Sequence, residues 1–165
     1  MRLLPFLDPQ PATSGRIPGS FAGDMSPALS KVLEEIRQAD LPQFTDVPLD
    51  SANVRGGAFG ETILHIVAIW GDAAAAGVLI DEGAEIDVQA EQGCTPLHEA
   101  ALQGHVDVVT LLLSRGADPA LRCEFGDFFE IAARSDSEFL RRVATETQNG
   151  EPSRRANRRQ PPRSL

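Results

Sequence analysis

The sequence predicts an all-α repeat solenoid, a fold in which short helices stack side by side along the chain. Two observations lead to this prediction. A pattern of Thr, Leu, His and Gly residues returns after 33 positions without a gap, and each copy contains two short helical segments that end at a glycine. Isolated helices shorter than about 12–15 residues are marginal in water. We therefore expect each repeat to bury its apolar side against the next one.

The repeat is clearest when residues 60–87 are aligned with residues 93–120. At least seven positions are identical at a single offset, which is not expected by chance. The matched pairs are Gly60 and Gly93, Thr62 and Thr95, Leu64 and Leu97, His65 and His98, Gly71 and Gly104, Gly83 and Gly116, and Ala84 and Ala117.

The architecture of one repeat follows from residues 93–120. Thr95 is a good N-cap residue, and Pro96 suits the first helical position, where its missing N–H costs nothing. A first helix is expected to end near Gln103, before Gly104, with its small and apolar residues facing inward. A second helix over residues 106–115 ends at Gly116, which supplies a left-handed C-cap. Its apolar stripe consists of Val106, Val109, Leu112 and Leu113.

The repeats lie between two ends of different composition. Residues 1–25 contain four prolines and no periodicity, which predicts a disordered leader. Residues 26–57 are expected to form an N-terminal helix, capped by Ser26, and an extended arm ending in a hairpin. Repeats are expected at about 58–90, 91–123 and 124–148, the last being a degenerate C-terminal capping repeat of two helices. Its helices are indicated by the capping-box spacings of Asp127 with Glu130 and of Ser135 with Glu138. Residues 149–165 carry five Arg and three Pro, and we expect a disordered, Arg/Pro-rich tail.

Composition and charge exclude several classes of function. The net charge is −9, and residues 26–148 alone carry 21 acidic and 8 basic side chains. No Lys or Arg occurs from Gly56 to Ser114, so the folded domain lacks the basic surface that nucleic-acid binding requires. No apolar stretch is long enough to span a membrane, and the first residues do not resemble a signal peptide. Cys94 and Cys123 form no C-x-x-C motif, which favours reduced thiols of a cytoplasmic protein. We also expect a monomer.

The second repeat, "TPLHEAALQGHVDVVTLLLSRGADP", resembles the ankyrin repeat almost position for position. The resemblance is clear over residues 60–125 and weaker as far as about residue 146. The first repeat departs from the family pattern at Ile63, where proline is usual. The "HIVAIWGD" segment is similar to first repeats of small bacterial ankyrin proteins. In the third repeat the Thr-Pro-Leu-His signature is missing.

The spacing of Cys94, His98 and His105 raises the question of a metal site. The ankyrin resemblance implies instead that His65 and His98 bind the preceding Thr and neighbouring backbone, and that His105 opens the second helix of its repeat. A zinc site also needs about four converging ligands, and no fourth one is indicated. We expect no metal and no cofactor. Because no catalytic motif occurs either, we expect a protein that is not an enzyme.

The resemblance further implies a protein-binding concave side made of hairpin tips and inner helices. Apolar anchors within a charged rim are typical of such a patch. The expected contact residues are Phe59, Glu61, Ile69, Trp70, Glu91, Gln92, Glu99, Leu102, Gln103, Glu124 and Phe125.

Two functions are compatible with this surface. The first is a small adaptor or inhibitor, such as an immunity-type protein, that binds a basic protein through an acidic concave face. The alternative is a targeting or effector module in which the ankyrin domain and the basic tail contact different partners.

Overall fold

A computed structural model describes residues 25–56 and 59–150. The expected leader, apart from Met25, and all but the first two residues of the expected tail lie outside the described residues. The described part contains seven α-helices, two short 3₁₀ turns and one small hairpin. None of its helices is long and apolar enough to cross a bilayer.

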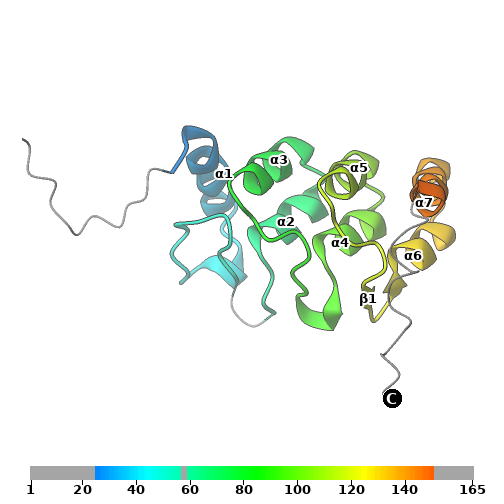
Figure 1. Cartoon of the computed structure of the whole chain (residues 1–165). Helices are drawn as coiled ribbons and strands as arrows, with labels where there is room; N and C mark the ends of the chain where they lie inside the picture. Colours follow the sequence, from blue (N-terminus) through cyan, green and yellow to red (C-terminus); the bar gives the residue numbers. More distant parts are fainter. Residues whose placement is uncertain (1–24, 57–58, 151–165) are drawn as a thin grey trace, which may run out of the picture.

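The helices form two layers (Figure 1). The inner layer is α2 (Ile63–Trp70), α4 (Pro96–Gln103) and α6 (Phe128–Arg134), in which each helix contacts the next. The outer layer is α1 (Pro27–Gln38), α3 (Ala73–Asp81), α5 (Val106–Ser114) and α7 (Glu138–Gly150), which contact one another in the same order. This stacking confirms the predicted all-α solenoid.

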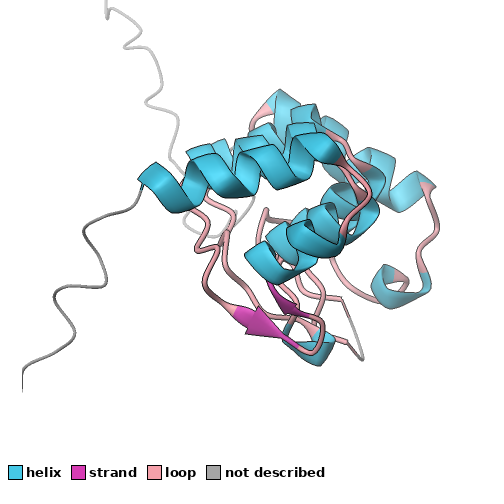
Figure 2. Cartoon of the chain, turned by 90° about the vertical axis from the view of Figure 1, so that its right-hand side faces the viewer, coloured by secondary structure: helices cyan, strands magenta, loops and turns pink. Residues whose placement is uncertain are grey.

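The segments that connect the repeats extend away from the helical layers (Figure 2). The third one contains the antiparallel strands β1 (Arg122–Cys123) and β2 (Gly126–Asp127). The second one instead holds a 3₁₀ turn, Glu91–Gly93, and an isolated bridge joins Arg55 to Thr62 before the first repeat. A further 3₁₀ turn, Pro42–Phe44, lies in the arm after α1.

Each inner helix begins and ends as the sequence predicts. Thr62 and Thr95 are N-caps, and the histidine three residues later completes a capping box in both repeats. Gly71 and Gly104 end the helices with φ angles of 77° and 81°, a left-handed conformation that favours glycine. The identical local geometry explains why the two units repeat at 33 residues.

The core runs continuously through both layers. Leu64 and Leu97 of the inner helices and Leu79 and Leu112 of the outer helices have no exposed surface. The predicted stripe of α5 is partly wrong, because Val108 is buried while Val106 and Leu113 are only half-buried. Packing of α5 against α3, α4 and α7 selects the buried positions Val108, Val109 and Leu112.

The N-terminal helix has a more specific place than the sequence indicated. Since α1 packs on α3 in the outer row, it takes the position of the outer helix of an incomplete repeat. The arm that follows is fixed by Asn53, whose amide donates to the Gly83 carbonyl at 2.9 Å and accepts the Glu85 N–H at 2.7 Å. The arm thereby covers the side of the first full repeat that no preceding repeat would cover.

The third repeat forms two helices, although its boundaries differ from the prediction. Asp127 caps α6 by accepting the Glu130 N–H. Ser137, not Ser135, accepts the amide of Leu140 in the first turn of α7. Asn149 and Gly150 belong to α7, so the expected tail boundary at residue 149 falls inside the helix.

Candidate functional site

The connecting segments are held in register by backbone hydrogen bonds that repeat with the helices. The Glu91 N–H donates to the Phe59 carbonyl at 2.8 Å, and the Glu124 N–H donates to the Gln92 carbonyl at 2.9 Å. These two bonds are related by the 33-residue offset. They bring four of the sequence-predicted contact residues into one row, which we call the tip row.

Histidines fix the inner helices below the tip row. The Thr62 N–H donates to His65 Nδ1 at 3.1 Å, and the Nε2 atom lies 3.1 Å from the Cys94 carbonyl oxygen. Because a carbonyl only accepts, Nε2 carries the proton and the ring is neutral. Burial lowers the pKa of His65 to about 4. His98 is held in the same way, between the Thr95 N–H and the Leu121 carbonyl.

His105 has a different structural partner. Its Nε2 atom donates to the Ile69 carbonyl at 2.9 Å and so links the start of α5 to the end of α2. All three histidines therefore have defined structural contacts. Among the residues that the structure describes, no group of three or more His, Cys, Asp or Glu side chains could hold a metal ion.

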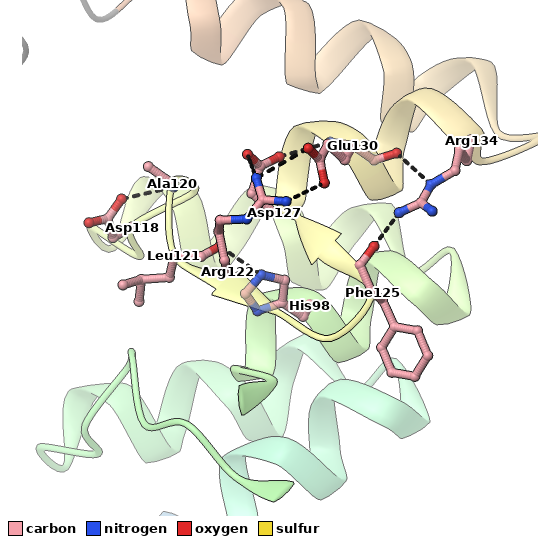
Figure 3. Close-up of polar contacts among 9 residues, drawn as sticks. All are labelled: His98, Asp118, Ala120, Leu121, Arg122, Phe125, Asp127, Glu130 and Arg134. Carbon is pink, nitrogen blue, oxygen red and sulfur yellow. Dashed lines mark hydrogen bonds and ion pairs between the residues drawn. The ribbon is translucent and has the colours of Figure 1, made fainter. Parts of the chain in front are cut away.

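The third hairpin is held by charged side chains (Figure 3). Arg122 binds Glu130 at 3.1 Å and Asp127 at 3.5 Å, which joins β1 to β2 and to the first turn of α6. Arg134 donates to the carbonyls of Phe125 and Glu130. The Phe125 ring points away from this polar network, so the hairpin presents an apolar tip (Figure 3).

Most of the apolar contact residues predicted from the sequence are exposed. Ile69 is half-buried, whereas the larger side chains remain accessible. The exposed fractions are 49% for Phe59, 45% for Trp70, 41% for Leu102 and 43% for Phe125.

Two of these apolar side chains line a groove of about 520 Å³ beside the end of α4. They are Leu102 and Phe125, and Gln103 lines the same groove. Arg134 and Ser137 complete the wall, and neither was predicted from the sequence, because the third repeat has lost the family signature. Trp70 and Phe59 do not line this groove and belong to the neighbouring repeat.

The acidic contact residues lack the ion pairs that some other carboxylates form. Asp81, at the end of α3, is paired with Arg115, and Glu85 is paired with Arg55. Within residues 25–56 and 59–150, no ion pair includes Glu61, Glu91, Glu99 or Glu124.

Glu61 and Glu99 are also close enough to affect each other. Burial, together with the charge of Glu61, raises the pKa of Glu99. Glu61 accepts a hydrogen bond from the Gln43 amide at 3.3 Å, which does not neutralise its charge. A cation placed between the two carboxylates would relieve both the repulsion and the cost of burial.

We call the eleven predicted contact residues the inner face. It combines exposed apolar side chains with carboxylates that have no ion pair among the described residues. Sequence reasoning did not single out Phe139 on α7, which is 69% exposed. Phe139 lies on an outer helix and is not part of the inner face.

Comparison with known proteins identifies the family. The sequence model described as ankyrin repeats, with three copies, matches residues 34–123, more than half of the chain. The chain therefore belongs to the ankyrin-repeat family. The match begins within α1, which agrees with the position of this helix as part of an incomplete repeat.

Three relatives illustrate the range of proteins that contain similar repeats. The chain is 35% identical over 101 residues to mouse protein phosphatase 1 regulatory subunit 27, covering 58% of this chain and 63% of the relative. It is 33% identical over 78 residues to human BCL-6 corepressor-like protein 1, covering 47% of this chain and 4% of the relative. It is 42% identical over 62 residues to palmitoyltransferase Hip14 of Drosophila melanogaster, covering 37% of this chain and 10% of the relative. The chain thus spans less than two thirds of the length of each relative.

Ankyrin repeats generally mediate protein–protein interaction and are generally not catalytic. The solenoid supplies an extended rigid surface, and the exposed residues on it determine what is bound. Family membership thus defines the class of protein.

Proposed function

We propose that this chain is a small, non-catalytic adaptor or inhibitor that binds a basic protein through its inner face. The observation that carries the proposal is the coincidence of exposed apolar side chains with unpaired carboxylates. Asp81 and Glu85 are paired with arginines. No ion pair among the described residues includes Glu61, Glu91, Glu99 or Glu124. A basic partner supplies the missing charge.

Besides charge, a binding surface needs apolar anchors, and the exposed apolar side chains of the inner face can supply them. Aromatic and aliphatic anchors contribute most of the binding energy when they are buried at the centre of a contact, and charged rims mainly guide association. Phe59, Trp70, Leu102 and Phe125 are candidates for such anchors. One relative is named as a regulatory subunit, and an inhibitor of a basic enzyme, including one of the immunity type, fits this pattern.

We further propose that the protein is cytoplasmic and monomeric. Cys94 and Cys123 are both free thiols, which supports a reducing compartment. Burial raises the pKa of Cys94, so this thiol is poorly reactive.

The proposal can be tested by affinity capture with the full chain, a face variant and a matched control. The face variant is Leu102→Glu with Phe125→Glu, and the control is Phe139→Glu, which changes an exposed apolar residue outside the face. We expect wild type and control to capture the same basic protein and the face variant to lose it. Capture of one protein by all three chains, or of an acidic protein, would contradict the proposal. Equal melting temperatures of the three chains exclude unfolding as the cause.

A further inference from the structure

The chain contains a segment whose charge complements the inner face. Four carboxylates of that face have no ion pair among the described residues. The 15 residues after Gly150 include five arginines and a single acidic residue, Glu151. The arginines are Arg154, Arg155, Arg158, Arg159 and Arg163.

The fold places the start of this segment at the correct end of the molecule. Only three residues join α6 to α7, and helices joined by so short a loop run antiparallel. Gly150, at the end of α7, therefore lies toward the end where α6 begins, which is the end that carries the hairpins.

The preceding repeat shows how far the chain must run from an outer helix to the tip row. Eight residues lead from Ser114, the end of α5, to Arg122 at the start of β1. Glu124 then joins the tip row through its hydrogen bond to the Gln92 carbonyl. The segment of 15 residues after Gly150 is longer than this path.

The remaining length is sufficient to cross the face. An extended chain spans at most about 3.3–3.6 Å per residue, or about 50 Å for 15 residues. Packed helices lie about 8–10 Å apart, so the inner face extends over about 20 Å between the first and third repeats. Arginine also forms two parallel hydrogen bonds with a carboxylate, which suits it to these sites.

We propose that residues 151–165 dock on the inner face of the same chain, with their arginines against Glu61, Glu91, Glu99 and Glu124. The contact is an intramolecular counter-ion for a surface that is otherwise unpaired. Its consequence for binding rests on the proposed function. A basic partner must displace the segment before it can bind the inner face. The segment therefore weakens the binding of non-basic or weakly basic competitors, and only a partner with sufficient affinity replaces it.

The contact itself can be tested without any partner. Amide NMR spectra of the full chain are compared with those of a variant in which the five arginines are replaced by serine. We expect shifts at the tip row and along the exposed side of α4, and none on the outer helix α5. These differences are expected to vanish at about 1 M salt, where the Debye length is about 3 Å. Unchanged spectra at the inner face would overturn the proposal.

A peptide of residues 151–165 provides the second test, by fluorescence anisotropy at low and high salt. An attached segment acts at an effective concentration in the millimolar range. We expect the peptide to bind the arginine-to-serine variant about tenfold more tightly than wild type. The peptide should bind only weakly to a matched chain in which Gln replaces Glu61, Glu91, Glu99 and Glu124. Equal affinity for wild type and the serine variant would contradict intramolecular docking.

Two further outcomes separate this proposal from its alternatives. If the NMR differences grow with protein concentration, the segment contacts a second copy and the intramolecular assignment is wrong. If the peptide and NMR results are as expected but no basic protein is captured, the docking stands and the proposed function fails. If a basic protein is captured with equal affinity by wild type and the serine variant, the proposed function stands and the docking fails.

Discussion

His105 and Gly71 lie in direct contact across two repeats. The His105 ring reaches back to the end of α2, where its Nε2 atom donates to the Ile69 carbonyl at 2.9 Å. A Cβ atom added at Gly71 would come within 2.6 Å of the ring. Gly71 is therefore required both for its left-handed backbone and for the space that the histidine occupies.

This relationship predicts a difference between two equivalent glycines. Gly71 and Gly104 have φ angles of 77° and 81°, so alanine at either position costs about 1–2 kcal/mol in backbone strain. A Cβ at Gly104 meets no atom within 4 Å. Gly71→Ala should therefore lose a further 1–3 kcal/mol, roughly the cost of overpacking. Denaturant unfolding of both variants measures the difference, and equal losses would show that His105 adapts freely.

The buried histidine of the first repeat predicts a dependence of stability on pH. His65 has an ordinary pKa of 6.5 and a pKa of about 4 in the folded chain, because burial disfavours its charged form. At a pH between these two pKa values, His65 binds a proton in the unfolded chain but not in the folded chain. The contribution is thus fully present above pH 6.5 and is lost as the pH falls toward 4, by about 3 kcal/mol in total.

Unfolding free energies of wild type and His65→Gln at pH 7 and pH 4.5 isolate this contribution. We expect the variant to be less stable at pH 7 and to lose less stability on acidification. The carboxylates titrate in both chains and therefore cancel in the comparison. A pH dependence identical in the two chains would mean that folding does not change the pKa of His65.

The core predicts where truncation is most damaging. Leu97 and Leu112 belong to one repeat and are fully buried in different layers. Replacing either by alanine should reduce the free energy of unfolding by about 2–5 kcal/mol. Leu102→Ala is the matched control on the same inner helix, since Leu102 is 41% exposed and should lose much less. Similar losses at Leu102 and Leu97 would contradict the assignment of the buried side.

Local signals explain which parts of the fold could be predicted from the sequence. Thr95, Pro96 and Gly104 mark the ends of α4 by caps that act within a few residues, so the repeat could be located by inspection. The position of α1 beside α3 depends on tertiary packing and leaves no such signal. For the same reason Ser135 resembled a capping residue, although Ser137 makes the bond at the start of α7.

For a related reason, only some residues of the site could be predicted from the sequence. Exposed positions such as Trp70 and Phe125 follow from the repeat register. Arg134 and Ser137 line the groove only because the degenerate third repeat folds as it does. The lack of ion pairs at Glu91 and Glu99 could not be predicted, since pairing depends on which arginines of other repeats come near.

The charged and apolar residues of the inner face should affect different steps of binding to the partner. Charges at the rim mainly accelerate encounter, and salt screens their effect. Buried anchors mainly slow dissociation. Glu91→Lys combined with Glu99→Lys should therefore lower the association rate, most strongly at low salt. Trp70→Ala should raise the dissociation rate and cost about 2 kcal/mol or more of binding energy, as interface hot spots do.

The matched control for charge is Glu82→Lys combined with Asp107→Lys, which reverses two exposed carboxylates on the outer side of the solenoid. The measurement is binding kinetics, at two salt concentrations, with the basic protein captured by the wild-type chain. The outer-side control should change the association rate much less, because its charges lie away from the contact. If both pairs slow association equally, net charge alone attracts the partner. If affinity survives the inner-face changes and disappears when residues 151–165 lose their arginines, the partner binds that segment and the inner face is not the interface.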